Sequence, residues 1–395
     1  MTKSLGPVLM VHPTADLYGS DRVFLESVSA LVLAGKSVIV ALPVTGPLEQ
    51  ELRRRGARVE NCPSPVLRKS MFQPRGLLNA LGTTWSGLRQ GTQLIRKIRP
   101  STIYVNTVTV PLWNVLARIF RVPLLVHVHE GEASASAAAR LVLAAPLLLS
   151  TTLIANSRSS AIVIHKSLGR LGPRTTVIYN AVPGPRHPVP IRKPLTAPVR
   201  LIYVGRLSPR KGVDVAISAL ALLDKEGIPA ELELVGAVFP GYEWYEKELE
   251  AQIAHLRLDG RVRFHGFVSA VWELVASCDI LLVPSRGDES FGNTAVEGIL
   301  AGRPVIASNN TGLIEATAGY GSAQRVAPDD PHAIVAAVRE LMQTWDEVPA
   351  ALAEDLVTAR SRHGLEQYQQ RIVEAVDGCQ SMTGHEPRTL ETRKP

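Results

Sequence analysis

The chain alternates short apolar runs with longer stretches of helical periodicity, and this alternation limits the folds that it can adopt. Continuous apolar runs rich in Val, Ile and Leu are typical of parallel strands buried on both faces. The sequence therefore predicts an α/β fold with two doubly wound, Rossmann-like domains. The expected strands are VLMVH, SVIVALP, RVENC, STIYVNT, LLVHVH, TTLIANS and TTVIYN, and then VRLIYVG, AELELVG, VRFHGF, ILLVPS and PVIAS.

A proline-rich stretch separates the two sets of strands. The sequence PGPRHPVPIRKPLTAP occupies residues 183–198, and it can continue neither a strand nor a helix. We therefore expect an N-terminal domain over residues 1–182, a linker over 183–198 and a C-terminal domain over 199–362.

The C-terminal end of the chain carries one further amphipathic pattern. Residues 363–377 predict a helix with four apolar or aromatic side chains on one face, and residues 378–395 form a polar tail that we expect to be disordered. The face consists of Leu365, Tyr368, Ile372 and Val376.

The net charge of +7 is unevenly distributed along the 395 residues. No acidic residue lies between Glu60 and Glu130. This charge pattern fits either a solvated face or a patch that meets an anionic membrane, a lipid diphosphate or a nucleic acid. Aromatic residues are not interleaved with the cations, which makes nucleic acid an unlikely partner. The cations are Arg68, Lys69, Arg75, Arg89, Arg96, Lys97, Arg99, Arg118 and Arg121, with Arg53, Arg54, Arg55 and Arg58 upstream.

Targeting and redox signals are weak. The apolar run near the N-terminus is too short for a secretory signal, and the longest apolar segment is interrupted by Pro146. Cys62, Cys278 and Cys379 are far apart and lack metal-ligand spacing. We expect a cytoplasmic protein, with possible peripheral contact at the inner membrane face.

The stretch VGRLSPRKG predicts an anion site. A strand ends near Gly205, a helix begins near Val213, and Arg206, Arg210 and Lys211 lie between them. Cations at a helix N-terminus oppose the helix dipole, and the sequence shows no local acidic compensation for them. A bound phosphate or diphosphate would turn this repulsion into charge-assisted hydrogen bonds.

The stretch ESFGNTAVEG predicts a second part of the same site. It follows the strand ILLVPS, and it places Glu289 and Glu297 on either side of a Phe-Gly turn. We expect Asn293 to cap a helix that begins at Thr294, and Gly292 to bring the backbone close to a ligand. Carboxylates suit neutral hydroxyls, so a ligand with a diphosphate flanked by hydroxyl-rich groups, a nucleotide sugar, fits both stretches.

These motifs resemble the retaining family 4 glycosyltransferases of the GT-B fold. Glu289 and Glu297 have the family's E-x7-E spacing, and VGRLSPRKG is similar to its diphosphate loop. YGSDR resembles its glycine-containing first loop, although Tyr18 stands where glycine is frequent. HVHE resembles its histidine at the end of a strand. The resemblance covers nearly the whole chain, and it implies a C-terminal helix that crosses back to the N-terminal domain.

The resemblance also implies roles for individual residues. The catalytic set would be His129, Arg206, Lys211 and Glu289, with His127 as the alternative histidine. The donor would contact Gly19, Arg206, Lys211, Val268, Glu289, Phe291, Gly292, Asn293, Thr294 and Glu297. The acceptor would contact Tyr18, Asn106 and His127. Within the donor set, Arg206 and Lys211 would hold the diphosphate, Glu297 the ribose and Glu289 the sugar hydroxyls.

The expected activity is metal-independent transfer of a sugar, with retention, from a UDP- or GDP-sugar to an acceptor hydroxyl. No Asp-x-Asp element follows a strand end, so we expect no metal and no cofactor besides the donor substrate. The expected acceptor is lipid-linked or a saccharide, in cell-surface polysaccharide or glycolipid synthesis. A sugar-nucleotide epimerase on the same fold is the alternative, and a basic nucleic-acid-binding module is an alternative from another class. A nicotinamide dehydrogenase is disfavoured because no G-x-G-x-x-G follows the first strand.

Overall fold

The computed structural model describes residues 6–67, 74–131, 136–239 and 241–382, and only the backbone of residues 74–81. The chain divides into two compact units. Unit 1 contains Met1–Glu130, Ala135–Ala181 and Leu365–Pro395. Unit 2 contains Gly131–Ser134 and Val182–Gly364. Unit 1 is therefore built from both ends of the chain.

Unit 1 is organised around a parallel sheet with the order β3-β2-β1-β4-β5-β6-β7. Each strand coincides with one of the predicted apolar runs. The central strands are buried along their whole length because helices cover both faces of the sheet. The strands are β1 (Val8–Val11), β2 (Val38–Leu42), β3 (Arg58–Asn61), β4 (Thr102–Asn106), β5 (Leu124–Val128), β6 (Thr152–Ala155) and β7 (Thr175–Val177).

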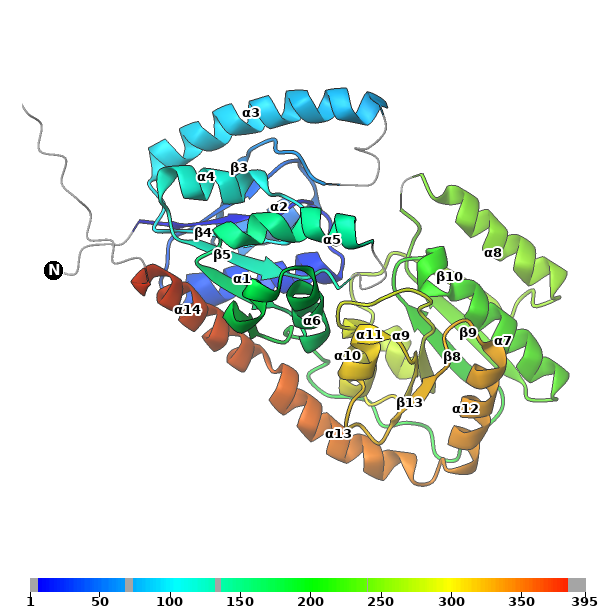
Figure 1. Cartoon of the computed structure of the whole chain (residues 1–395). Helices are drawn as coiled ribbons and strands as arrows, with labels where there is room; N and C mark the ends of the chain where they lie inside the picture. The colour runs from blue at the N-terminus through cyan, green and yellow to red at the C-terminus, as the bar shows by residue number, and fades with distance from the viewer. Residues whose placement is uncertain (1–5, 68–73, 132–135, 240, 383–395) are drawn as a thin grey trace, which may run out of the picture. The chain divides into compact units, whose positions relative to one another are not determined.

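Two hydrophobic cores lie on opposite faces of this sheet. One contains side chains of α1 (Gly19–Leu33), α2 (Pro47–Arg54) and α14 (Leu365–Ser381), and the other contains side chains of α3 (Pro74–Ile98), α4 (Leu112–Phe120) and α6 (Arg158–Ser167). Figure 1 shows α3 and α4 on one side of the sheet and α1 with α14 on the other. The helix α5 (Ala137–Ala144) precedes β6.

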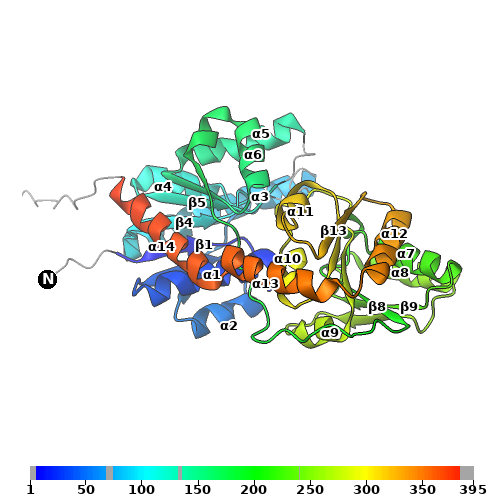
Figure 2. The ribbon, with the colours of Figure 1, turned by 90° about the horizontal axis from the view of Figure 1, so that it is seen from below.

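The C-terminal helix is an integral part of unit 1. α14 lies beside α1 in both views (Figures 1 and 2) and buries Tyr368, Ile372, Val376 and Cys379. The prediction that the polar tail begins at residue 378 is wrong, because Cys379 extends the buried stripe by one more turn and the helix continues to Ser381. Residues 383–395 of the expected tail lie outside the described residues.

Unit 2 repeats the same architecture with the sheet order β10-β9-β8-β11-β12-β13. All neighbouring strands are parallel. Every strand of unit 2 except β13 was predicted from an apolar run in the sequence. The strands are β8 (Val199–Val204), β9 (Ala230–Val235), β10 (Val262–Gly266), β11 (Ile280–Val283), β12 (Val305–Ser308) and β13 (Ala323–Val326).

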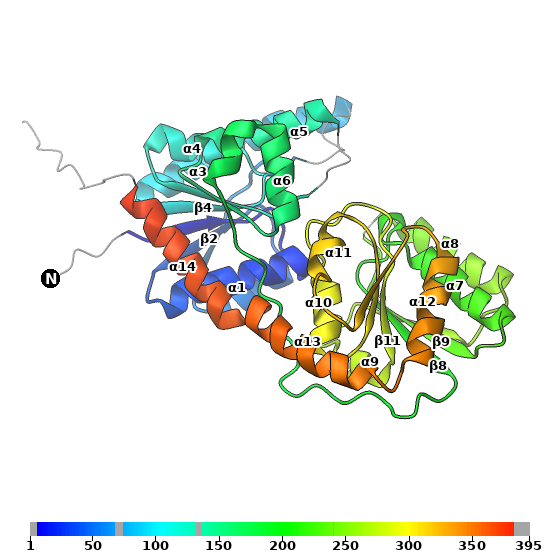
Figure 3. The ribbon, with the colours of Figure 1, turned by 60° about the horizontal axis from the view of Figure 1, so that its bottom comes forward.

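Helices also cover both faces of the second sheet (Figure 3). α7 (Val213–Lys225), α8 (Glu243–His255) and α12 (Pro331–Gln343) pack on alternate strand residues such as Ile280 and Leu282. α10 (Asn293–Leu300) packs on the opposite face, where its Gly298 leaves no room for a Cβ beside Val305 and Leu281. The remaining helices are α9 (Trp272–Ser277), α11 (Thr311–Ala316) and α13 (Val348–His363).

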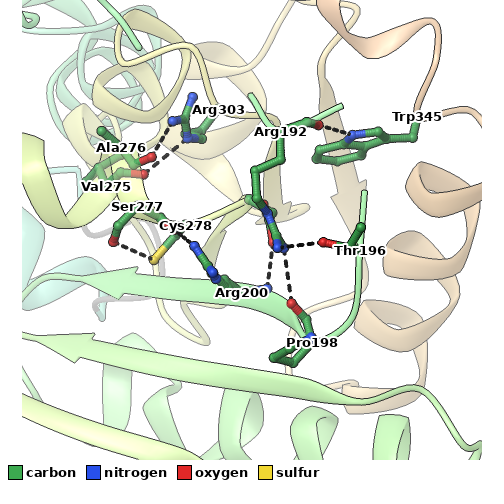
Figure 4. A network of polar contacts seen from close by, with 11 residues as sticks. Arg192, Thr196, Pro198, Arg200, Val275, Ala276, Ser277, Cys278, Arg303 and Trp345 are labelled. Atoms are coloured by element: carbon green, nitrogen blue, oxygen red, sulfur yellow. Dashed lines mark hydrogen bonds and ion pairs between the residues drawn. The ribbon is translucent and has the colours of Figure 1, made fainter. Parts of the chain in front are cut away.

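Side chains of unit 2 hold the proline-rich segment in place (Figure 4). The Arg192 guanidinium donates to both carboxylate oxygens of buried Asp279, with an Nε–Oδ1 distance of 2.7 Å. Trp345 Nε1 donates to the Arg192 carbonyl at 2.8 Å, and buried Arg303 donates to the Val189 carbonyl at 2.7 Å. Residues 183–198 therefore have fixed contacts with unit 2, although their sequence predicts only a linker.

Both sheets change direction at a pair of adjacent strands. In unit 1 the first strand, β1, lies beside β4, and in unit 2 the first strand, β8, lies beside β11. In open α/β sheets, ligands bind outside the carboxyl ends of the strands at such a switch point. The loops that follow these four strands are therefore the first places to search for a site.

Candidate active site

In unit 2, the loops after β8 and β11 pack directly against each other. The loop after β8 includes a single 3-10 turn, Pro209–Lys211, and ends at Gly212, which has φ +67° and precedes α7. A Cβ on Gly212 would lie 2.0 Å from the Pro284 carbonyl oxygen, so no side chain fits there. The Arg210 carbonyl also accepts the backbone N–H groups of Arg286 and Gly287. This close packing brings the two predicted motifs together.

Glu289 is the centre of the resulting polar cluster. It is 8% exposed, and its Oε1 accepts from Lys211 Nζ at 2.8 Å, Ser285 Oγ at 2.8 Å and Arg210 Nη1 at 3.2 Å. Burial opposes ionisation of this carboxyl, but Lys211 and Arg210 outweigh burial and hold its pKa below the usual value. The carboxylate is therefore ionised and acts only as an acceptor.

The expectation that the cations before α7 have no acidic compensation is wrong. Glu289 forms ion pairs with Arg210 and Lys211. In addition, the negative charge of Asp214 lies in the first turn of α7, where it interacts favourably with the helix dipole. Arg286 donates to both carboxylate oxygens of Asp214 and thereby ties the second loop to the start of α7. Glu289 lies 78 positions after Lys211, so local sequence rules could not find this compensation.

Arg206 follows β8 at the same edge of the sheet. Its guanidinium carbon lies 4.0 Å from the centroid of the Phe239 ring, and its carbonyl accepts from Tyr203 Oη at 2.7 Å. Stacking on an aromatic face orients a planar guanidinium without removing its charge. The structure thus places both expected diphosphate ligands, Arg206 and Lys211, in the loop after β8.

The Phe-Gly turn is built differently from the prediction. α10 begins at Asn293, so Gly292 rather than Asn293 occupies the N-cap position, and Thr294 is already inside the helix. Gly292 has φ +122°, a conformation that favours glycine, and a Cβ there would lie 2.5 Å from Leu313 Cδ2. The Phe291 side chain is buried against His363, with ring centroids 5.3 Å apart, so Phe291 can offer a ligand only its backbone.

The remaining expected donor residues of unit 2 are partly accessible. Glu297 is half-buried one turn into α10, and Val268 is half-buried two residues after the end of β10. Among the residues that the structure describes, no group of three His, Cys, Asp or Glu side chains is placed to hold a metal ion.

Unit 1 carries a second polar cluster at its own switch point. His12 directly follows β1, and its Nε2 lies 2.6 Å from Asp21 Oδ1. Asn106, at the end of β4, lies between two histidines: its Nδ2 is 3.0 Å from His12 Nδ1, and its Oδ1 is 2.9 Å from His129 Nε2. Three of these side chains, Asp21, His12 and Asn106, are at most 2% exposed. A continuous hydrogen-bonded chain therefore connects Asp21 to His129.

His127 and His129 differ in surroundings although only one residue separates them. His127 lies inside β5, is fully buried, and its Nδ1 is 2.6 Å from Tyr104 Oη. Its buried Nε2 has no hydrogen-bond partner among the described residues. His129 follows the strand and is half-buried, with its ring 4.1 Å from that of His127. His129 is thus the more accessible of the two expected histidines.

Burial keeps both histidines neutral. Desolvation, together with the nearby His12, lowers the pKa of His129 to about 3, and desolvation and His129 lower the pKa of His127 well below its usual value. A histidine with such a pKa carries no proton to donate as an acid at neutral pH. His129 can therefore contribute a neutral, oriented hydrogen-bonding group.

The other expected residues of unit 1 lie at the start of α1. Gly19 is the first residue of the helix, and the Tyr18 backbone N–H donates to Asp21 Oδ2 at 2.8 Å in a capping interaction. His12 and Asp21 were not predicted from the sequence as site residues. The available signal was the position of His12 directly after the first strand, adjacent to the strand that ends at Asn106.

Comparison with known proteins identifies the family. Residues 191–356 match the family model described as glycosyl transferases group 1, and residues 19–181 match that of the glycosyl transferase 4-like domain. The two matches leave out only residues 1–18, 182–190 and 357–395. The chain belongs to the family 4 glycosyltransferases. The family resemblance of its motifs is thereby confirmed.

Relatives with sequences similar to this chain are known from several bacteria. Glycogen synthase of Mycobacterium tuberculosis is 32% identical over 258 residues, which is 62% of this chain and 60% of that protein. A GDP-mannose-dependent alpha-(1-6)-phosphatidylinositol dimannoside mannosyltransferase of the same species is 34% identical over 148 residues, 36% of this chain and 35% of that protein. The chain thus aligns with less than two thirds of the length of either relative.

Solved structures confirm the GT-B fold. Anabaena HepE, in complex with UDP and glucose, superposes with a TM-score of 0.78 at 22% identity, covering 94% of this glycosyltransferase and 99% of that chain. Sucrose-phosphate synthase of Thermosynechococcus elongatus superposes with a TM-score of 0.76 at 19% identity, covering 94% and 98%. At these identities the similarity establishes the fold alone.

The neutral buried histidines predict that acid weakens unit 1. His127 binds a proton in the unfolded chain near pH 6.5 but not in the folded one, so stability falls as the pH drops below about 6.5. Replacing His127 by Asn, which keeps a polar atom near Tyr104, should remove about 2 kcal/mol of the stability loss between pH 7 and pH 5. Native-state hydrogen exchange of the β4 and β5 amides at pH 5 and pH 7, corrected for intrinsic exchange rates, measures the stability of unit 1 at each pH. The control is His255→Asn on the exposed end of α8, and equal pH dependence in wild type and His127→Asn would contradict the assignment.

Proposed function

We propose that this protein transfers a sugar from a nucleoside diphosphate sugar to an acceptor hydroxyl, with retention of anomeric configuration. The observation that carries the proposal is the packing of Lys211 and Arg210 against Glu289 at the switch point of unit 2. Cations for a diphosphate and a carboxylate for hydroxyls lie there within hydrogen-bond distance of each other. The names of similar proteins support this substrate class. One relative is a GDP-mannose-dependent mannosyltransferase, and the structure of one protein with a similar fold contains UDP and glucose.

The barrier of this reaction is departure of the diphosphate from an oxocarbenium-like carbon. Arg206, Lys211 and backbone N–H groups at the start of α10 would stabilise the negative charge that develops on the leaving group. These groups would make a divalent metal unnecessary. Glu289 would orient Lys211 and accept from a sugar hydroxyl, and Glu297 would accept from the ribose hydroxyls.

Unit 1 would supply the acceptor side of the reaction. Tyr18, Gly19 and Asn106 lie around the switch point of its sheet, and His127 and His129 lie at the end of the neighbouring strand β5. We assign His129 to the reacting sugar rather than to proton transfer, because a neutral imidazole with a pKa of about 3 is suited to hydrogen bonding.

Lys211 provides the sharpest test of the leaving-group role. The Lys211→Ala variant should lose roughly 10²–10³ in kcat, the scale of one removed transition-state donor. Lys225→Ala, at the exposed end of α7, is the matched control and should keep wild-type turnover. Because Lys211→Ala also leaves buried Glu289 with fewer donors, its melting temperature must be measured alongside. Wild-type kcat with only KM changed would exclude the leaving-group role.

A donor panel tests the substrate class and separates transfer from epimerisation. A UDP- or GDP-sugar present at 100 times its Kd should raise stability by about 2.7 kcal/mol, which thermal unfolding detects. Incubation of the stabilising donor without acceptor should give at most slow hydrolysis. Accumulation of an epimerised donor would instead favour the alternative, an epimerase on the same fold. The anomeric configuration of a transferred sugar, read by NMR, tests retention.

We also propose that unit 1 touches an anionic membrane that carries a lipid-linked acceptor. On α4, Val115 and Ile119 are exposed beside Arg118 and Arg121, and the 61–129 interval that contains them has no acidic residue. The upstream cations contribute less, because Arg53, Arg54, Arg55 and Arg58 pair with Glu49, Glu51, Glu26 and Glu60. Arg68, Lys69 and the Arg75 side chain lie outside the described residues. No helix in the described part of the chain has the length and hydropathy needed to span a bilayer.

The membrane proposal predicts salt-dependent binding to anionic vesicles. Arg118→Glu combined with Ile119→Ser should reduce co-sedimentation with phosphatidylserine-containing vesicles, because the double variant removes one attraction and one apolar contact. Lys225→Glu on unit 2 changes the charge equally and should have no effect. Sedimentation that is absent, or that is insensitive to both salt and the double variant, would refute this surface.

A further inference from the structure

Asp21 determines which group donates and which group accepts at each hydrogen bond of the chain that connects it to His129. Asp21 is 2% exposed and accepts three hydrogen bonds: Oδ1 accepts from His12 Nε2 and from Thr14 Oγ1 at 2.7 Å, and Oδ2 accepts from the Tyr18 backbone N–H. Burial opposes its ionisation, but the hydrogen bonds that it accepts from His12, Thr14 and Tyr18 hold the pKa of Asp21 below its usual value. An ionised carboxylate has no proton to donate, so His12 must carry its proton on Nε2.

The donor and acceptor roles of Asn106 and His129 follow in turn from those of His12. Asn106 presents its amide nitrogen to His12 Nδ1 at 3.0 Å, and an amide nitrogen only donates, so His12 accepts at Nδ1 and carries its single proton on Nε2. The other end of the same amide is an oxygen, and it faces His129 Nε2 at 2.9 Å. An amide oxygen accepts only, so His129 must carry its own proton on Nε2. Its Nδ1 then holds a lone pair.

We propose that Asp21 fixes the tautomer of His129 through His12 and Asn106, so that His129 meets a substrate hydroxyl as an acceptor at Nδ1. Asp21, His12 and Asn106 are positioning residues in this scheme, since only His129 would touch the substrate. The substrate part of the proposal rests on the proposed transferase function. The tautomer part depends only on unit 1.

Replacing Asp21 by Asn should reverse the whole chain without changing its shape. The Tyr18 N–H still needs an acceptor, so the new amide turns its oxygen toward Tyr18 and its NH2 group toward His12. His12 must then accept at Nε2 and donate from Nδ1, which turns the Asn106 amide around. The amide nitrogen of Asn106 now faces His129 Nε2 and moves the proton of His129 to Nδ1. Thr14→Val removes a bond to Asp21 but leaves the carboxylate, so it is the matched control.

Nitrogen-15 NMR of the histidine rings of the full chain tests the tautomer directly, because protonated and unprotonated ring nitrogens differ widely in chemical shift. His129→Asn, which lacks the signal, assigns the resonances. We expect a protonated Nε2 on His129 in the wild type and in Thr14→Val, and a protonated Nδ1 in Asp21→Asn. A protonated Nδ1 in the wild type overturns the proposal even if Asp21→Asn fails to fold. An unchanged tautomer in folded Asp21→Asn also overturns it.

Kinetics then separate this proposal from the function on which it rests. With transfer established, Asp21→Asn should lower kcat about 10- to 100-fold, because the hydroxyl would meet a donor where it needs an acceptor, while Thr14→Val should keep the wild-type value. Reversed tautomers with unchanged kcat would refute the substrate contact at Nδ1. The expected tautomers in a protein that neither binds nor transfers any sugar would refute the transferase and leave the tautomer relay standing.

Discussion

Parallel pairing of strands that are far apart in sequence is the constraint on which the rest of this structure depends. A strand in a parallel sheet has its backbone groups paired on both sides and its side chains buried on both faces, so its chemistry can only lie where it ends. β8 and β11 are neighbours with about 75 residues between them, and their ends bring Arg206 and Lys211 to the loop of Glu289. The same rule joins β1 to β4 in unit 1 and brings His12 to Asn106. One rule of sheet topology thus builds two polar clusters in one chain.

The two clusters use buried charge in opposite ways. In unit 2, Glu289 is surrounded by donors, so two cations are held in place next to an acid that stays ionised. In unit 1, Asp21 is the single charged end of a chain of neutral groups, and it acts at a distance through their donor and acceptor pattern. A buried charge without such partners would cost several kcal/mol, and in both clusters the hydrogen bonds offset that cost. The residues around these clusters also make defined contacts: Arg286 hydrogen-bonds to Asp214 and thereby connects the loop after β11 to α7.

Sequence patterns predicted most of the fold because apolar runs and helical periods are local signals. The strands from β1 to β12 follow such runs, whereas β13, with the sequence AQRV, has no apolar pattern and was missed. The motifs also located the loops that carry Arg206, Lys211, Glu289 and His129. Local rules failed wherever the partner was distant: they could not pair Glu289 with Lys211, nor connect His12 with His129. They also misplaced the cap of α10 by one residue, because Asn is a common cap and the positive φ of Gly292 is visible only in three dimensions.

The return of the chain to unit 1 has a consequence for the order in which the protein can form. The sheet of unit 1 is complete at β7, but the core on the face that carries α1 lacks the side chains of α14 until residues 365–381 have been synthesised. Unit 2 ends at Gly364, before this helix, and needs no later segment. On the ribosome, the unit whose residues emerge first is therefore the unit that is completed last. Phe24 and Val28 are among the apolar side chains of its core that can pack fully only after Ile372 and Val376 have emerged.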